Sequence, residues 1–387
     1  MLVSSLPMPA APAGCAPSLR FTAMLLSLGL LPLLVHAPAP CSAAPSPAPP
    51  TPDVQELASL PDPDGEPADM GKKVQVFILM GQSNMLGAGK VGPAEKEGSL
   101  THAVQTEGLY PFLVDDEGAW TERKDVRNVR VMASNGKTRT FHNEWMTVKG
   151  GRLGPEYGIG HHLGNAIDAP VMVLKSCIGN RSLGWDLLPP GSERFVREGQ
   201  VYAGYKDSPD RWEEGTEPVP INWYAGKQYD DDIASAKGVL EALEEHYPGA
   251  KGYEIAGFFW WQGAKDCGNV AHAERYEQNL VRLIEQLRAD FDAPEAKFVC
   301  ATLGQTTKET GGNEGLVLKA QLAVDGAAGN YEAFEGNVAS VYSNPYCRGG
   351  SANSHYGGDA RTYMDTGLAM GEAMVRLLQS KRTGRRR

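Results

Sequence analysis

The stretch that decides the fold is Val74-Gln75-Val76-Phe77-Ile78-Leu79-Met80, followed directly by Gly81-Gln82-Ser83-Asn84-Met85. The first seven residues are mostly apolar and β-branched over the length of one strand, which predicts a buried β-strand. Gly81 then breaks the run, and Ser83 stands just beyond it. A hydroxyl on the sharp turn after a buried strand projects above the sheet edge, where open α/β sheets bind their ligands. Ser83 is therefore a candidate nucleophile, although Gly, Ser and Asn also favour turns for backbone reasons alone.

Apolar spacing further along the chain predicts a series of alternating strands and helices. The expected strands cover residues 170–175, 253–261, 297–303 and 337–342, and the expected helices cover residues 154–163, 230–247, 276–291, 316–324 and 364–378. Strands that alternate with helices predict a mostly parallel sheet of five strands covered on both faces. Residues 86–147 are polar and turn-rich and receive no assignment. Residues 180–228 are predicted to form a long loop, and such a loop is typical of the wall of a binding cleft.

The length and charge of the chain restrict the class of protein. The 387 residues carry a formal net charge of −10 and enough apolar residues for a large core. An acidic chain is a poor partner for nucleic acid, which requires a basic surface. The seven residues 381–387 are basic, but a run this short is expected to be a solvated tail.

The N-terminal residues have the pattern of a secretion signal. Arg20 precedes a short apolar run at residues 21–35, and the small residues Ala37 and Ala39 follow it. We assign residues 1–40 to a cleavable signal, since the apolar run is too short and too proline-interrupted to span a membrane. Residues 41–71 are rich in Pro and Ala and are expected to be a linker. The folded domain is predicted at residues 72–380, exported to the periplasm or the extracellular space.

Export affects how the cysteines are interpreted, because an oxidising compartment permits disulfides. Cys300 lies in a predicted strand and is expected to be a buried thiol. Cys267 and Cys347 both lie in polar, glycine-rich segments and are candidates for a bridge, although sequence alone does not establish connectivity.

Three further polar segments stand directly after predicted strands. They are Cys177-Ile178-Gly179-Asn180-Arg181, Trp261-Gln262-Gly263-Ala264-Lys265-Asp266 and Asn353-Ser354-His355-Tyr356. Parallel sheets gather their sites at the carboxyl ends of the strands, so these segments are expected to meet Ser83 there.

These segments resemble the SGNH hydrolases. The Gly-Gln-Ser-Asn start at Gly81, the Gly179 turn, Trp261-Gln262-Gly263 with Asp266, and His355-Tyr356 resemble the sialate O-acetylesterase-like group, which includes acetylxylan esterases of carbohydrate esterase family six. The resemblance spans nearly the whole folded part in the correct order. It implies a flavodoxin-like three-layer αβα fold and cleavage of acetyl esters from carbohydrates without a metal or other cofactor.

The residue types fit that chemistry. Ser83 needs a base to take its proton, and histidine, here His355, is the residue type suited to that task. The backbone N–H groups of Ser83 and Gly179 and the amide of Gln262 are the expected oxyanion hole. The substrate contacts are expected at Asn84, Arg181 and Trp261, which stand within or beside the same segments.

The sequence departs from the family at two positions that concern the orienting acid. Many SGNH enzymes carry Asp three residues before the histidine, where this chain has Ala352, and Ala264 replaces a Glu often found after Gln-Gly. Asp266 is retained and is our first choice for the acid. Asp359 is the alternative, although an Asp just before a helix is more often an N-cap.

We therefore expect an exported serine esterase acting on an acetylated carbohydrate. A glycan-binding module that has lost turnover together with its acid is the alternative from another class. A lipase is a third possibility, but the residues Trp185, Trp212 and Trp223 stand among charges in the long loop, which suits sugars better than acyl chains.

Overall fold

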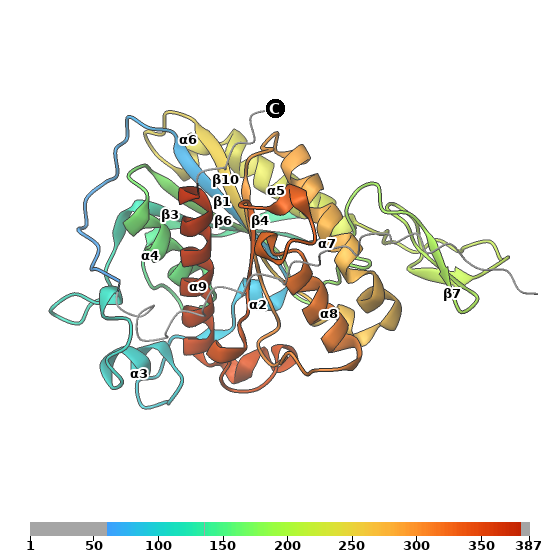
Figure 1. Cartoon of the computed structure of the whole chain (residues 1–387). Helices are drawn as coiled ribbons and strands as arrows, with labels where there is room; N and C mark the ends of the chain where they lie inside the picture. Colours follow the sequence, from blue (N-terminus) through green and yellow to red (C-terminus); the bar gives the residue numbers. More distant parts are fainter. Residues whose placement is uncertain (1–59, 135, 381–387) are drawn as a thin grey trace, which may run out of the picture. The chain divides into compact units, whose positions relative to one another are not determined.

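The computed structural model describes residues 60–134 and 136–380 (Figure 1). The predicted secretion signal at residues 1–40, the linker as far as residue 59 and the tail at residues 381–387 lie outside the described part of the chain. Within the described ranges, no helix combines the length and the hydropathy needed to cross a membrane.

The core of the described chain is one seven-stranded sheet with strand order β12-β11-β10-β1-β6-β3-β4. The strands are β1 (Val74–Gly81), β3 (Arg123–Ser134), β4 (Lys137–Met146), β6 (Val171–Ser176), β10 (Tyr253–Trp261), β11 (Lys297–Ala301) and β12 (Val338–Val341). Every neighbouring pair is parallel except β3 and β4. The mostly parallel α/β architecture is as expected, and the five predicted strands are all present.

The prediction of five strands is wrong in number because it missed the β3–β4 hairpin. This hairpin lies in the segment 86–147 that received no assignment. Strand β3 mixes buried Val126, Val129 and Val131 with Arg, Lys and Asn, and β4 is an edge strand whose first five residues are exposed. An edge strand with one solvated face has few apolar residues, so its sequence resembles a loop.

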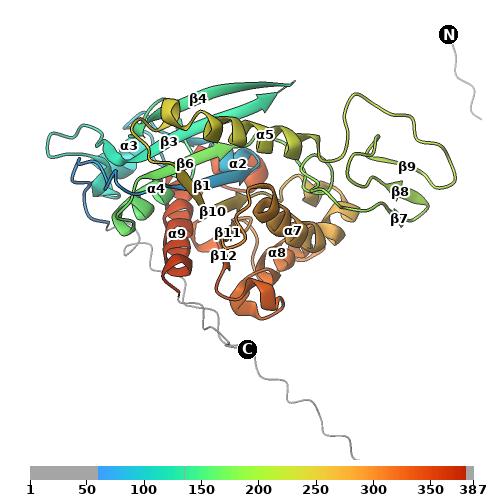
Figure 2. The ribbon, with the colours of Figure 1, turned by 90° about the horizontal axis from the view of Figure 1, so that it is seen from above.

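Helices cover both faces of the sheet (Figure 2). Helices α4 (Glu156–Ala166) and α9 (Ala360–Gln379) pack together on one face, and α5 (Lys227–Glu241) and α7 (Val270–Asp290) lie on the other. Successive side chains of a strand point to opposite faces. Trp260 accordingly donates its indole N–H to the hydroxyl of Tyr276 on α7 at 3.2 Å, while the ring of Trp261 contacts Tyr363 on α9.

The shorter elements complete the described chain. They are helices α2 (Ser83–Leu86), α3 (Leu100–Gln105), α6 (Leu243–His246) and α8 (Gly312–Ala323), the strand pair β2 (Gly89–Lys90) and β5 (Arg152–Leu153), and six short 3-10 helices at Pro111–Leu113, Asp266–Gly268, Gly326–Ala328, Glu332–Phe334, Asn344–Tyr346 and Ala352–Gly358. The predicted long loop at 180–228 holds a three-stranded antiparallel sheet of β7 (Phe195–Arg197), β8 (Gln200–Tyr202) and β9 (Arg211–Glu213). We call residues 195–213 the arm (Figure 1).

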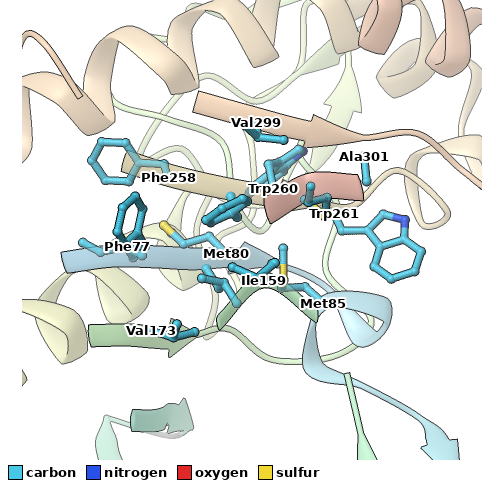
Figure 3. Packing of buried hydrophobic residues seen from close by; sticks show 14 of the residues in the cluster. Phe77, Met80, Met85, Ile159, Val173, Phe258, Trp260, Trp261, Val299 and Ala301 are labelled. Atoms are coloured by element: carbon cyan, nitrogen blue, oxygen red, sulfur yellow. The ribbon is translucent and has the colours of Figure 1, made fainter. Parts of the chain in front are cut away.

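Apolar side chains of the central strands form the core (Figure 3). Phe77 on β1, Val173 on β6, Trp260 on β10 and Val299 on β11 are all inaccessible to solvent. Strands that are buried on both faces have continuous apolar sequences, which explains why these strands were predictable. Strands β10, β1 and β6 are adjacent, so the polar segments that follow them meet at one edge of the sheet.

Cys267 and Cys347, the candidates for a disulfide, are both free thiols in the structure, so the structure does not contain that bridge. Burial raises the pKa of the Cys267 thiol to about 12 and that of the Cys347 thiol to about 11. Both thiols are therefore protonated at neutral pH. Cys300 is buried in β11, as predicted.

Candidate active site

A cleft of about 960 Å³ opens at the carboxyl edge of the sheet. Its walls come from the Ser83 turn, the Gly179 turn, the loop that carries His355, the arm and the start of α7. The lining residues include Gln82, Ser83, Gly179, Trp185, Asp186, Tyr202, Asp210, Arg211, Lys265, His272, Ala352 and His355. Ser83, Gly179 and His355, which are far apart in sequence, therefore share one cleft.

The Ser83 turn lies at the end of β1, against the end of β10. A side chain at Gly81 would place its Cβ 2.4 Å from the carbonyl oxygen of Trp261, so only glycine fits there. Ser83 is the first residue of helix α2, and its N–H has no acceptor within the helix. Lys175, buried on β6, donates to the carbonyl of Leu86 at the other end of α2. Lys175 is in turn paired with buried Glu156, which makes Glu156 a structural residue.

Gly179 lies directly beside the nucleophile candidate. A Cβ at this position would stand 3.4 Å from the Cβ of Ser83. Among the described residues, the N–H of Gly179 donates to no acceptor. Two backbone donors, from Ser83 and Gly179, are thus close to the Ser83 side chain.

The loop that carries His355 has an unusual backbone. His355 and Tyr356 both adopt left-handed conformations, with φ of 52° and 50°. Non-glycine residues in this region persist only where surrounding contacts hold them, and they cluster at functional sites. The hydroxyl of Tyr363 donates to the carbonyl of His355 at 3.3 Å, and the ring of Tyr356 stacks on Trp261. The half-buried His355 ring makes no hydrogen bond to any described residue.

Asn84 connects the two loops. Its side-chain amide donates to the carbonyl of Ala352 at 3.3 Å, and its oxygen, 3.2 Å from the hydroxyl of Tyr363, shares that hydroxyl proton with the carbonyl of His355. Only 1% of Asn84 is exposed. The residue therefore fixes the spacing between the Ser83 turn and the His355 loop instead of facing the cleft.

Gln262 and Asp266 belong to a buried network behind the cleft wall. The two N–H groups of the Gln262 amide are shared among three acceptors, Asp266 at 2.5 Å, the carbonyl of Arg181 at 2.9 Å and Gln82 at 3.1 Å, while its oxygen accepts from the hydroxyl of Tyr276. The side-chain oxygen of Gln82 also accepts from two backbone N–H groups of the segment after β10. Gln262 is 1% exposed and does not line the cleft.

Asp266 does not orient His355 in this structure. Its carboxylate accepts from the backbone N–H groups of Leu183 at 3.0 Å and Gly184 at 2.8 Å, as well as from Gln262. Burial raises the pKa of Asp266, and the nearby His272 and these hydrogen bonds offset that rise in part. The acid instead ties the segment after β6 to the segment after β10.

Asp359, the alternative acid, is the N-cap of α9. Its side chain accepts from the N–H of Arg361 at 2.9 Å and pairs with the guanidinium of the same residue. The two acids that line the cleft, Asp186 and Asp210, do not contact His355 either. Within the described chain, no carboxylate lies within hydrogen-bond distance of the His355 ring.

The structure also corrects the predicted substrate contacts. Trp261 is completely buried, and its indole N–H donates to the carbonyl of Thr302 at 3.0 Å, so neither Trp261 nor Asn84 is available to a ligand. Arg181 is partly exposed but does not line the cleft. Its guanidinium lies over the ring of Trp223 and donates to Gln228. Buried aromatic and amide residues in a motif thus serve the packing of the loops.

Several residues that line the cleft were not singled out from the sequence. The arm contributes Tyr202, Asp210 and Arg211, and the start of α7 contributes His272. The prediction that segment 180–228 forms a cleft wall is confirmed, and Trp185 lies on that wall. The available signal was the length of the segment, which does not indicate which of its polar residues face inward.

The fold and the cleft define a class: a mostly parallel α/β protein in which a serine from the turn after central strand β1 and a histidine from the loop after edge strand β12 line one cleft. Residues 209–334 match the family described as carbohydrate esterase, sialic acid-specific acetylesterase. This match confirms the predicted resemblance to the sialate O-acetylesterase-like group. The matched residues include Gln262 and Asp266 but not Ser83 or His355.

Solved structures that resemble the chain include proteins from plants and bacteria. A protein from Arabidopsis thaliana is 18% identical with a TM-score of 0.43, covering 78% of this chain and 98% of its own. A carbohydrate acetylesterase from Xanthomonas citri is 13% identical with a TM-score of 0.42, covering 77% of this chain and 55% of its own. NanS is 15% identical with a TM-score of 0.37, covering 71% of this chain and 78% of its own. No curated protein matches the chain.

Proposed function

We propose that the chain is a serine esterase that removes acetyl groups from carbohydrates through an acyl-enzyme. The observation that carries the proposal is that Ser83, Gly179 and His355 line one cleft, although separate loops supply them. The family match over residues 209–334 supports the reaction type and the carbohydrate substrate.

The proposed reaction uses a serine, an imidazole and two backbone donors. The Ser83 hydroxyl oxygen attacks the carbonyl carbon of the acetyl ester while His355 takes its proton. The oxyanion that forms is stabilised by the N–H groups of Ser83 and Gly179. Collapse of this intermediate breaks the ester C–O bond, and His355 returns the proton to the departing sugar oxygen. A water molecule, activated by the same imidazole, then releases acetate from Ser83.

In the proposed mechanism no acid orients His355, and the contacts of its own loop hold the residue in place. His355 is held by the hydrogen bond from Tyr363 to its carbonyl and by Tyr356, whose ring packs on Trp261. We therefore propose a Ser–His dyad instead of a triad, since the members of a triad contribute unequally to the rate. Gln262 is assigned to positioning the oxyanion hole, because its amide is bonded to neighbouring loops.

A glycan-binding module without turnover remains the second candidate. The observation that favours it is the absence of any described carboxylate at hydrogen-bond distance from the His355 ring. Both candidates predict carbohydrate binding, and only the esterase predicts release of acetate.

Turnover and active-site labelling test the proposal. The mature protein should hydrolyse 4-nitrophenyl acetate, and a fluorophosphonate probe should label Ser83. Ser83→Ala should remove both the labelling and the activity while leaving the melting temperature unchanged. Labelling of another residue, or an active Ser83→Ala variant, would contradict the assignment. Binding of acetylated glycans without any release of acetate would favour the binding module.

We also propose that the protein is exported, on the strength of the signal pattern at residues 1–40. Expression of the full chain in a bacterial host followed by N-terminal sequencing of the exported protein tests this. Cleavage near residue 40 is expected, and full-length protein confined to the cytoplasm would contradict it.

A further inference from the structure

The cleft contains a second histidine, on a different wall from the one that carries His355. His272 lies in the first turn of α7, and only 6% of it is exposed. A Cβ at Gly184 would stand 2.4 Å from Cγ of the His272 ring, so this ring is held tightly against the Gly184 backbone. The ring nitrogen Nε2 is buried and has no hydrogen-bond partner among the described residues.

Asp210 of the arm faces this imidazole. Its Oδ1 lies 3.4 Å from Nε2 of His272 but outside hydrogen-bond geometry, and Oδ1 is likewise buried without a partner in the described chain. Buried polar atoms are nearly always paired, and each exception calls for a physical explanation. Both residues line the same cleft and neither atom makes a hydrogen bond to a described residue, so a group bound in the cleft at this pair would satisfy both.

The arm is held in place, which makes this arrangement a built site. Arg197 pairs with Glu274 on α7 at 2.8 Å, and the guanidinium of Arg275 lies 4.5 Å from the centre of the Phe195 ring. Phe195 stacks on Tyr202, whose ring meets His272 edge-on at 6.1 Å. These contacts fix the position of Asp210 relative to α7.

The chemistry of the pair selects a hydroxyl group. A hydroxyl both donates and accepts a hydrogen bond, so one hydroxyl is able to accept from the imidazole N–H and donate to the carboxylate. A cation would leave the imidazole N–H unpaired, and an anion would be repelled by Asp210. Trp185 lies on the same cleft wall and offers an apolar surface to the C–H face of a ring.

We propose that Asp210 and His272 form a hydroxyl-binding pair that, with Trp185, holds a sugar ring of the substrate while its acetyl ester reaches Ser83. This inference rests on the proposed function and adds to it the place where the sugar is recognised. The two roles lie on different parts of the fold: the loops of the sheet edge carry the chemistry, and the arm with α7 binds the sugar. Acetate esters that lack a sugar do not use the pair.

The test compares a substrate that has a sugar with one that lacks it. Acetylated xylo-oligosaccharides, O-acetylated sialic acid and 4-nitrophenyl acetate are assayed with wild type and with Asp210→Asn, which keeps the size of the side chain. Asp210→Asn should raise KM for the better saccharide about tenfold, since the hydroxyl then donates to a neutral amide oxygen instead of a charged carboxylate. Its kcat and its activity on 4-nitrophenyl acetate should not change.

Two further variants make the result specific to the pair. Glu213→Gln changes an exposed acid on β9 that does not line the cleft, so it should leave both substrates unaffected. His272→Gln should raise KM like Asp210→Asn, and the double variant should be little worse than either one, because one hydroxyl bridges both groups. An equal loss on the saccharide and on 4-nitrophenyl acetate, or no loss at all, would overturn the proposal.

A different measurement applies if the protein is not an esterase. If the wild type hydrolyses no acetate ester, saccharide binding at the Asp210–His272 pair is measured instead. Tryptophan fluorescence is followed during titration with xylo-oligosaccharides and with sialic acid. About tenfold weaker binding by Asp210→Asn than by wild type would support the subsite without catalysis. No binding of either saccharide by wild type would overturn it.

Discussion

Two groups of polar residues meet at the carboxyl edge of the sheet, and they differ in how completely their polar atoms are bonded. The first group, behind the cleft wall, includes Gln262 and Asp266, whose side chains are buried and hydrogen-bonded to neighbouring loops. The second group, Ser83 and His355, lines the cleft, and neither side chain makes a hydrogen bond to a described residue. Both groups come from the same short motifs.

The difference separates residues that build a site from residues that react in it. A buried polar group without a partner is destabilising, so the loops are held together by fully bonded side chains. A reacting group must instead be free to bond with the substrate. The presence of a residue in a motif therefore does not show that it reacts. We expect substitutions in the first group mainly to lower stability and substitutions in the second group mainly to lower activity.

The largest expected effect is on activity, at His355. His355→Asn preserves the left-handed backbone, because Asn tolerates this conformation, but it removes the base. We expect kcat/KM for 4-nitrophenyl acetate to fall at least about a thousandfold, which corresponds to about 4 kcal/mol of transition-state stabilisation. The melting temperature should stay the same, since the ring makes no hydrogen bond in the described structure.

The control for this variant is His246→Asn, a histidine of α6 that does not line the cleft. Its activity should equal that of the wild type. A large loss of stability in His355→Asn would place His355 in the structural group and remove the contrast.

The next effect is on stability, at Asp266. Asp266→Ala leaves the backbone N–H groups of Leu183 and Gly184 without their acceptor and removes one of the hydrogen bonds of the Gln262 amide. Each lost partner of a buried donor costs about 1–3 kcal/mol, so we expect the free energy of unfolding to fall by about 3 kcal/mol. Chemical denaturation measures this, with the exposed Asp116→Ala as the control. An unchanged unfolding midpoint together with inactive protein would make Asp266 a member of the reacting group after all.

The pKa of Asp266 adds a dependence on pH. Burial raises this pKa above its value in the unfolded chain, so the folded protein binds the proton more tightly. The contribution is fully present below the unfolded value of about 3.9 and is lost as pH rises through the folded pKa. We expect the stability of the wild type relative to Asp266→Asn to decline as pH rises above about 4. Parallel pH profiles for the two proteins would contradict the shift.

The smallest effect is expected at Asp359. Asn is as good an N-cap as Asp, so Asp359→Asn should lose mainly the ion pair with Arg361, at most about 1 kcal/mol of stability. Activity on 4-nitrophenyl acetate should be unaffected. A loss of activity close to that of His355→Asn would instead return Asp359 to the role of orienting acid and replace the proposed dyad with a triad.

The strands of the buried core were predicted from the sequence, whereas the polar edge hairpin and the very short strands of the arm were missed. Strand β10 was predicted at its observed bounds, Tyr253–Trp261, because a strand buried on both faces is one apolar run between polar segments. The β3–β4 hairpin was missed, since its polar edge strand carries no such signal. The arm was missed for a similar reason: its strands have three residues each, too few to show an alternating pattern.

The sequence by itself indicated a mostly parallel α/β protein that resembles the sialate O-acetylesterase-like group, with Ser83, Gly179 and His355 following predicted strands in order. It did so because apolar runs and turn residues act locally along the chain. Only the tertiary structure decided that Asn84, Trp261 and Gln262 are buried and that Asp266 bonds to backbone N–H groups instead of His355. Only it brought Asp210 to His272. Which polar atoms pair depends on loops that meet across the sheet edge, and the spacing of residues along the chain does not encode those meetings.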